Sequence, residues 1–276
     1  PRPPCLTSVL HIFAPAGPCP ATIGFYRPDS VLHPMKRPPA PRTLLLLYLV
    51  LAAGTLALPT SATARDAPWP GQTLNGRDCS EFAYTHGYGP YNYNNSRHRR
   101  ENLSVVENYH FTEQVRTLRR GETAQSPLGD LEYTVGAFPN HHKALYAMIR
   151  YATEDAYERE SKKAWNTPPR SGRLRPPPEC YLQRAVNFAP EDHRVRILYG
   201  LFLHRNNEYE NAIEAYKTAL DIEPSSAEAH YNMGLLLFDM ERYRNATEHA
   251  REAYELGYPL KGLKNRLTAK GYQITE

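Results

Sequence analysis

Three histidines are the side chains of this chain best suited to chemistry. His141 and His142 are adjacent, and His110 follows Glu107 by three positions. Histidine beside a carboxylate can bind a metal ion or act as a general base. Adjacent helical residues point about 100° apart and cannot share one ion, and no HExxH-type partner or convincingly spaced third ligand accompanies them. The pattern favours capping or packing roles over a histidine-based metalloenzyme, so we expect no catalytic residue, metal or cofactor.

The first 64 residues predict export. Residues 1–34 are rich in proline without periodicity, and we interpret Met35 as the true start, with upstream sequence translated before it. Residues 35–64 combine a basic beginning, an apolar run from Leu44 to Leu58 and the cleavage pattern Ala62-Thr63-Ala64, as in a secretory signal peptide. The apolar run is shorter than the roughly 20 residues of a membrane span. Cleavage would leave no membrane span, and an uncleaved anchor is the alternative.

The charge that remains after cleavage argues against a nucleic-acid partner. Residues 1–64 hold five of the 33 Lys and Arg residues and one of the 29 Asp and Glu residues, so residues 65–276 carry 28 of each. A nucleic-acid-binding surface needs an excess of basic side chains. We therefore expect a protein or peptide partner.

Cys79 and Cys180 are the two cysteines of residues 65–276. An exported protein meets an oxidising compartment, where such a pair can form a disulfide. The other interpretation is two buried thiols that pack as small apolar groups, because sequence alone does not show proximity.

A repeat of 34 residues organises the second half of the chain. Five matched pairs lie 34 positions apart: Pro190 and Pro224, Gly200 and Gly234, Leu203 and Leu237, Ala212 and Ala246, Ala219 and Ala253. This is the tetratricopeptide period, in which two helices approach closely at Gly and Ala positions and a proline ends the second helix. The expected fold is all-α, a tetratricopeptide solenoid of helical hairpins.

Residues 139–258 should hold three such units, the first beginning at Pro139. Asn140 is a good N-cap and would place the two adjacent histidines in the first helical turn. This unit exceeds the repeat by an insertion of 17 residues that contains five prolines, and Ile149 replaces the expected glycine. The insertion carries three arginines: Arg170, Arg173 and Arg175.

The array should end in a capping helix over residues 259–276. Leu260, Leu263 and Leu267 recur at i, i+3 and i+7 after Pro259, which is the apolar stripe of a helix that covers the last repeat.

Residues 65–138 are less regular. The Tyr- and Gly-rich stretch around Tyr84–Tyr93 could form a carbohydrate- or peptide-binding surface, or it could clamp an irregular segment onto the first helices. A helix is predicted over 101–121 with Gly121 as its stop, and residues 130–139 resemble the end of a second repeat helix. The apolar set of the predicted helix is Leu103, Val106, Phe111, Val115 and Leu118.

Several strings extend the resemblance beyond the repeats. GYGPYNY, HFTEQVRTLRRG, GDLEYTVGAFPNHHKALYAM and ECYLQRAVNFAPEDHRVRILYGLFL together resemble a group of exported bacterial tetratricopeptide proteins. The resemblance covers nearly all of residues 65–276. It implies this architecture and a periplasmic location, and it names no substrate.

The resemblance to tetratricopeptide arrays implies a concave groove, lined by the first helix of each unit, that binds an extended segment or helix of a partner. The first two rows of groove positions are basic, which favours an acidic segment, whereas of the family's carboxylate-clamp positions only Asn232 plainly matches. The leading hypothesis is a non-enzymatic periplasmic scaffold or adaptor; the alternative is an accessory component of an envelope transport or assembly system. The groove positions are Lys143, Tyr146, Arg150, Arg194, Leu198, Leu201, Arg205, Tyr231, Asn232, Leu235 and Phe238.

Overall fold

The computed structural model describes residues 67–82, 87–154, 157, 162–163, 165 and 175–274. The chain divides into two compact units, Pro1–Leu56 and Ala57–Glu276, and all described residues belong to the second. The predicted upstream segment and signal peptide, residues 1–64, lie outside the described residues, as do Tyr84, Arg170 and Arg173. Among the residues that are described, no helix is long and apolar enough to cross a membrane.

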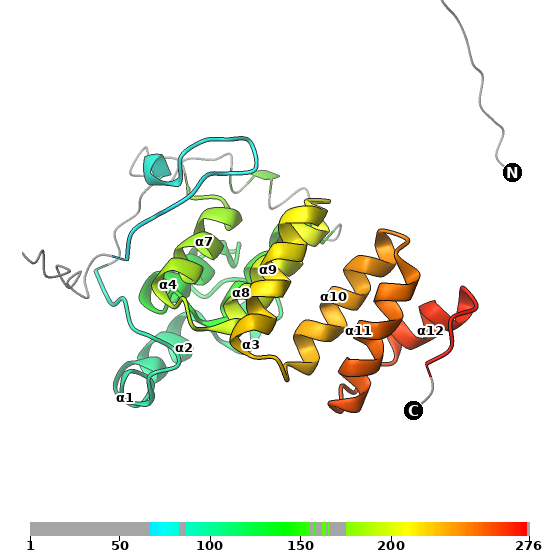
Figure 1. Cartoon of the computed structure of the whole chain (residues 1–276). Helices are drawn as coiled ribbons and strands as arrows, with labels where there is room; N and C mark the ends of the chain where they lie inside the picture. The colour runs from blue at the N-terminus through cyan, green and yellow to red at the C-terminus, as the bar shows by residue number, and fades with distance from the viewer. Residues whose placement is uncertain are drawn as a thin grey trace, which may run out of the picture. The chain divides into compact units, whose positions relative to one another are not determined.

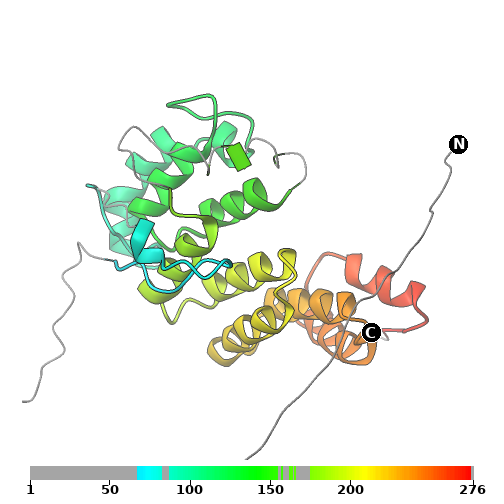
Figure 2. The same cartoon turned by 90° about the horizontal axis from the view of Figure 1, so that it is seen from above.

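The described part of the second unit is helical, and consecutive helices pack as hairpins. Helix α8 lies between α5 and α10, and α9 also packs against α10, so neighbouring hairpins share an interface (Figures 1 and 2). The hairpins are α5 (His142–Thr153) with α7 (Pro178–Phe188), α8 (His193–Arg205) with α9 (Tyr209–Ile222), and α10 (Ala227–Asp239) with α11 (Tyr243–Glu255).

The first helix of each hairpin begins at an equivalent capping residue. His141, Asp192 and Ser226 precede α5, α8 and α10, and each side chain accepts a hydrogen bond from a first-turn backbone N–H, at 3.1, 3.2 and 3.3 Å. The cap of α5 is therefore His141, and the prediction of Asn140 was wrong. The amide of Asn140 is engaged elsewhere, because it accepts from the Tyr93 N–H and donates to Asp192.

The second helices end in one recurring geometry. Phe138, Ala189 and Glu223 close α4 (Leu128–Ala137), α7 and α9 with φ between −136° and −126° and ψ between 71° and 87°. Each directly precedes a proline, whose ring excludes the helical conformation from the residue before it. Helix α4 thus has the stop of a second repeat helix, and it packs between α2 (Ser104–His110) and α5.

Glycine permits close contacts between helices, inside a repeat and against the capping helix. A Cβ at Gly200 would lie 2.6 Å from the ring of Tyr216, and one at Gly234 would lie 2.5 Å from a methyl group of Leu263. Ile149 occupies the same position in the first hairpin, where Leu182 stands at the place of Tyr216, and both side chains are buried in one core cluster. Leu182 is smaller than Tyr216 and leaves room for Ile149, which is larger than glycine. The two departures from the repeat pattern therefore compensate each other.

The single helix predicted over 101–121 was wrong. The hydroxyl of Thr134 donates to the His110 carbonyl at 3.3 Å, and the chain leaves the helix at Phe111. Leu118 adopts φ 60° and turns the chain before Gly121. The pieces are α1 (Ser96–His98), the π-turn η2 (Arg99–Leu103), α2, and α3 (Glu113–Arg116).

The capping helix is shorter than predicted. Helix α12 (Gly262–Ala269) packs against α10 and α11 through Leu263 and Leu267, both fully buried (Figure 1). Leu260 lies before the helix with 57% of its surface exposed, so it is not part of the buried stripe.

The described tyrosines of the irregular segment pack onto the first helices. The ring of Tyr93 lies 4.5 Å from that of His141, and Tyr91 lies 5.4 Å from Phe138. Tyr88 donates its hydroxyl hydrogen bond to Asn102. These contacts hold the irregular segment against the first helices, as in the second of the two interpretations. Tyr84 lies outside the described residues.

Residues 67–82 run along the outer side of α7. Arg184 donates to the Ala67 and Val135 carbonyls at 3.2 and 3.0 Å, and its guanidinium lies 4.9 Å above the Trp69 ring. Burial lowers the pKa of Arg184 to about 10, so the side chain still carries its charge at neutral pH. The structure also joins Cys79 to Cys180, which fastens this segment to α7.

Removal of this bridge should lower stability strongly. The bond closes a loop with a sequence separation of 101, and a loop of that size corresponds to about 4–5 kcal/mol in the chain-entropy model. We expect the double variant Cys79→Ala/Cys180→Ala to unfold at lower urea concentration than the oxidised wild type, and to be insensitive to reducing agent. Two alkylatable thiols in non-reduced, denatured residues 65–276, which contain only these two cysteines, would contradict the pairing.

Candidate functional site

A cavity of about 430 Å³ lies between α5, α8, α10 and the connection that follows α11. We call it the groove. Its walls come from the exposed sides of three first helices, because the opposite sides are buried against the second helices. Nine of the eleven predicted groove residues line it: Lys143, Tyr146, Arg194, Leu198, Leu201, Arg205, Tyr231, Asn232 and Leu235.

The two other predicted groove residues lie elsewhere. Arg150 forms a two-pronged ion pair with Glu154, at 2.7 and 3.1 Å, one turn further along α5. Phe238 is only 9% exposed, and the guanidinium of Arg266 on α12 covers its ring at 4.2 Å. Phe238 therefore contacts the capping helix and does not line the groove.

Five further residues line the groove. Ile197 and Glu228 stand in the predicted rows of α8 and α10, whereas His142, Tyr258 and Leu260 were not predicted. Tyr258 and Leu260 flank Pro259 in the connection between α11 and α12. Two bulky apolar residues in a short polar connection are the sequence feature that could have indicated a role in the groove. We assigned Leu260 to the stripe of a helix that begins only after it.

The groove has an excess of positive charge. Lys143 and Arg194 are exposed and make no ion pair among the described residues. Arg205 donates to the Thr153 hydroxyl at 3.1 Å and lies 3.9 Å from Glu154. The lining carboxylate in the described residues is that of Glu228, so three cations face one anion.

Aromatic rings form the end of the groove near α10. Tyr231 is 7% exposed and stacks on Tyr258 at 4.3 Å, which fixes both rings. Burial, with the nearby Glu228 carboxylate, raises the pKa of Tyr258 to about 12, so this wall is neutral at physiological pH. Tyr146 is 43% exposed and is free to contact a ligand.

Asp192 connects the two basic walls of the groove. Its carboxylate caps α8 and accepts hydrogen bonds from His142, Asn140 and Asn94 at 2.8–2.9 Å, although its side chain is only 3% exposed. Burial acts to raise the pKa of Asp192, but the hydrogen bonds and the His142 charge outweigh it and hold the pKa below its ordinary value. The sequence identified none of these pairings.

His141 is held as a neutral ring. Its Nδ1 accepts the cap hydrogen bond, so Nε2 carries the proton that is donated to Glu107 at 3.0 Å. Burial lowers the pKa of His141, against the opposing effect of Glu107. The His141 hydrogen bond in turn lowers the pKa of Glu107.

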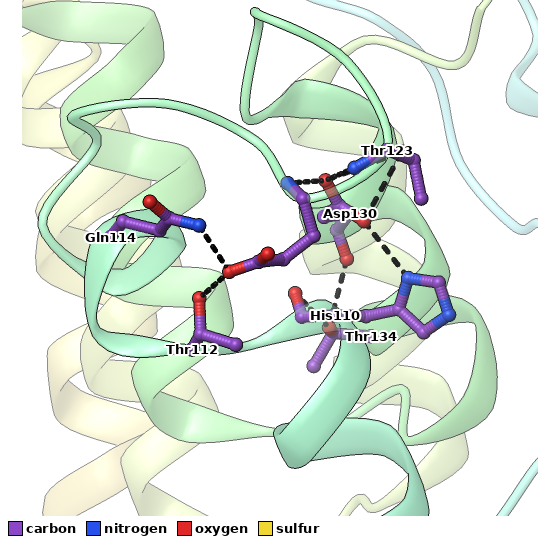
Figure 3. A network of polar contacts seen from close by, with 7 residues as sticks. His110, Thr112, Gln114, Thr123, Asp130 and Thr134 are labelled. Carbon is purple, nitrogen blue, oxygen red and sulfur yellow. Dashed lines mark hydrogen bonds and ion pairs between the residues drawn. The ribbon is translucent and has the colours of Figure 1, made fainter.

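His110 pairs with Asp130 and not with Glu107. Its Nδ1 lies 2.9 Å from the fully buried Asp130 carboxylate, which also accepts the backbone N–H groups of Glu122 and Thr123 (Figure 3). The Glu122 carboxylate accepts from Thr112 and Gln114 in the same network. The Asp130 carboxylate therefore fastens the loop that precedes α4. Glu107 and His110 do not pair with each other, because each has a separate partner. Within the described ranges, no group of three or more His, Cys, Asp or Glu side chains could hold a metal ion.

Comparison with known proteins identifies the repeats. Family models described as TPR repeat and tetratricopeptide repeat match residues 200–241 and 227–256. Together with the hairpins, these matches confirm an all-α tetratricopeptide solenoid, in a chain that carries repeats of a class typical of protein-interaction scaffolds.

Two curated relatives share part of the sequence. The peroxisomal targeting signal receptor of Candida glabrata is 32% identical over 78 residues, which cover 28% of this chain and 13% of that protein. The receptor of the same name from Candida albicans is 31% identical over 71 residues, which cover 26% of this chain and 12% of that protein. The chain thus matches about an eighth of the length of these relatives.

Loss of the Asp192 carboxylate should lower the free energy of unfolding far more than loss of a helix cap alone. Asp192→Ala removes the acceptor of the buried Asn140 and the partly buried His142, so we expect about 2–4 kcal/mol of destabilisation. The matched variant Ser226→Ala removes the equivalent cap alone and should cost about 1 kcal/mol. Equal urea midpoints for the two variants would show that the additional hydrogen bonds do not contribute.

Acidification should destabilise the protein through His141. Above its unfolded pKa of about 6.5 the neutral folded ring is at no disadvantage. Below that pH the histidine is protonated in the unfolded chain, whereas the buried ring of the folded protein stays neutral. The free energy of unfolding therefore falls as the pH drops toward the folded pKa, by at most about 1.4 kcal/mol per pH unit.

The variant His141→Asn retains a capping side chain and removes the titration. Its free energy of unfolding should fall less than that of the wild type between pH 7.5 and 5.5. The comparison is needed because burial raises the pKa of Glu132 to about 7, which gives a contribution of opposite sign. Parallel pH profiles would exclude His141 as a source of acid sensitivity.

Proposed function

We propose that this chain is a non-enzymatic scaffold that holds an acidic, extended segment of a partner protein in the groove. The observation that carries the proposal is the composition of the groove, in which Lys143, Arg194 and Arg205 stand over an otherwise largely apolar lining. Apolar area supplies affinity, and exposed cations chiefly set the association rate and the choice of partner.

The lining suggests how such a segment would lie. Carboxylates of the partner would approach Lys143 and Arg194, which have no ion pair among the described residues. An apolar side chain would cover Tyr146 and Leu260, which are 43% and 57% exposed. Exposed apolar groups inside a concave, mostly preformed cavity are typical of a binding site.

The names of the two yeast relatives support a peptide-binding role. Each is described as a receptor for a targeting signal. Only an eighth of their length is matched, so signal recognition by this chain is part of the proposal. The carboxylate-clamp pattern is incomplete here, and the proposal therefore requires an acidic segment and not a free carboxyl terminus.

We further propose that the protein acts after export, in the periplasm. This part rests on the signal-peptide pattern of residues 35–64 and on the resemblance to exported bacterial repeat proteins. The Cys79–Cys180 bridge supports it, because disulfides persist in oxidising compartments.

Charge reversal in the groove should weaken binding of an acidic peptide. The probe is a fluorescent octapeptide of alternating Glu and Leu, titrated into residues 65–276, with a Lys–Leu octapeptide as the opposite-charge control. We expect Arg194→Glu to raise the dissociation constant about tenfold, and rising salt to weaken binding to the wild type.

The matched control is Lys217→Glu, which reverses an exposed charge on α9 outside the groove. It should bind the acidic octapeptide as the wild type does. Tyr146→Ala tests the apolar contribution and should also weaken binding, since this exposed side chain has little structural role. Equal affinity of the wild type for both octapeptides, or no effect of Arg194→Glu, would reject the proposed site.

A further inference from the structure

A second cavity, of about 450 Å³, lies between α7, α8 and the N-terminal segment that runs along α7. We call it the α7–α8 cavity. Its lining residues are different from those of the groove: on α8, Arg194 lines the groove, whereas Arg196 lines the α7–α8 cavity. The volume is within the range of about 300–1,000 Å³ that is usual for small-molecule sites.

The outer wall of the α7–α8 cavity is held in a fixed position. Gln183 on α7 accepts the Gln72 N–H at 3.2 Å and donates to the Gln72 carbonyl at 2.7 Å. Gly71 packs tightly against the same side chain, because a Cβ there would overlap the Gln183 side-chain oxygen. The Cys79–Cys180 bridge fastens this segment to α7 as well. The wall is therefore preformed, which lowers the ordering cost of binding.

Arg196 is the one charged residue among the described residues that line the α7–α8 cavity. Its side chain is half-buried and makes no ion pair within the part of the chain that the structure describes. Its Nε is buried and has no hydrogen-bond partner there. A buried N–H without an acceptor is rare in native proteins, so each case requires an explanation. A ligand with an acceptor group that binds this guanidinium provides one.

Neutral donors and apolar groups complete the lining. Asn187 is exposed and contributes an amide, and Tyr199 contributes a ring and a hydroxyl. Burial, with Glu179 and Glu208 nearby, raises the pKa of Tyr199, so its hydroxyl keeps its proton at neutral pH and can donate a hydrogen bond. Neither of these two carboxylates lines the cavity. The apolar part of the lining comes from Pro70, Val186 and Pro190.

We propose that the α7–α8 cavity binds a carboxylate group attached to a small apolar body, carried either by a small organic acid or by the C-terminal residue of a peptide. One lining cation balances one carboxylate, whereas a phosphate dianion would retain a negative charge. The planar guanidinium can donate paired hydrogen bonds to both oxygens of a carboxylate, and such charge-assisted pairs are stronger than neutral hydrogen bonds. This site does not depend on the function proposed for the groove.

The test is an NMR titration of isotope-labelled residues 65–276 with N-acetyl-leucine, which joins one carboxylate to an apolar body of leucine size. N-acetyl-leucine amide has the same body without the charge. We expect the acid to shift the Nε–H signal of Arg196 and the N–H signal of Gly71 in a saturable way, and the amide to shift neither.

Variants locate the bound acid. Arg196→Gln should weaken its binding at least about tenfold, and Arg196→Lys should have an intermediate effect, because lysine keeps the charge without the paired donors. The urea midpoints of the ligand-free variants control for folding. The matched variant Lys217→Gln removes an exposed cation of α9 that does not line the α7–α8 cavity, and it should bind the acid as the wild type does.

A tetrapeptide of three alanines and a C-terminal leucine, acetylated at its N-terminus, distinguishes the two sources of the carboxylate. Tighter binding of this peptide than of N-acetyl-leucine indicates a peptide C-terminus, and equal or weaker binding indicates a small organic acid. Equal binding of N-acetyl-leucine and its amide, or binding of neither acid, would overturn the proposal. So would a loss of binding in Arg194→Glu that Arg196→Gln does not show, because it would place the acid in the groove.

Discussion

A single buried carboxylate, that of Asp192, determines how the first helices of this array meet. It caps α8 while it accepts hydrogen bonds from the first turn of α5, from Asn140 and from Asn94 in the irregular segment. A buried charge is tolerated only when such partners satisfy it, and these partners come from the start of α5 and from the irregular segment. The same interaction therefore positions two walls of the groove and docks the N-terminal segment.

A second acidic residue ties two of the groove helices to each other and to the capping helix. Asp239 on α10 contacts His204 on α8 at 2.9 Å and also pairs with Arg266 on α12. More than two turns earlier on α10, Tyr231 stacks on Tyr258 and ties this helix to the connection after α11. With the groove helices held in this way, a ligand finds a largely preformed surface, which lowers the ordering cost of binding.

Much of this architecture was predictable because repeats leave a periodic signal. Prolines, glycines and alanines 34 residues apart indicated the hairpins, and nine of the eleven groove positions inferred from the repeat line one cavity. The failures have local physical causes. At the break in the helix predicted over 101–121, Thr134 donates to the His110 carbonyl and the Asp130 carboxylate pairs with the His110 ring, and no glycine or proline marks the position. Asn140 looks like a cap by residue type, but a histidine takes that role because the register of the repeat places His141 there. Arg150 and Phe238 do not line the groove, because they contact Glu154 and Arg266 respectively. No repeat pattern encodes these contacts.

The central claim is that the surface shared by α5, α8 and α10 receives an acidic segment. The most direct measurement is a crystal structure of residues 65–276 with the Glu–Leu octapeptide bound. The account predicts that the peptide runs along the groove, with a carboxylate within about 4 Å of the Arg194 guanidinium or the Lys143 ammonium group. A peptide bound on another surface, with the groove unoccupied, would contradict it.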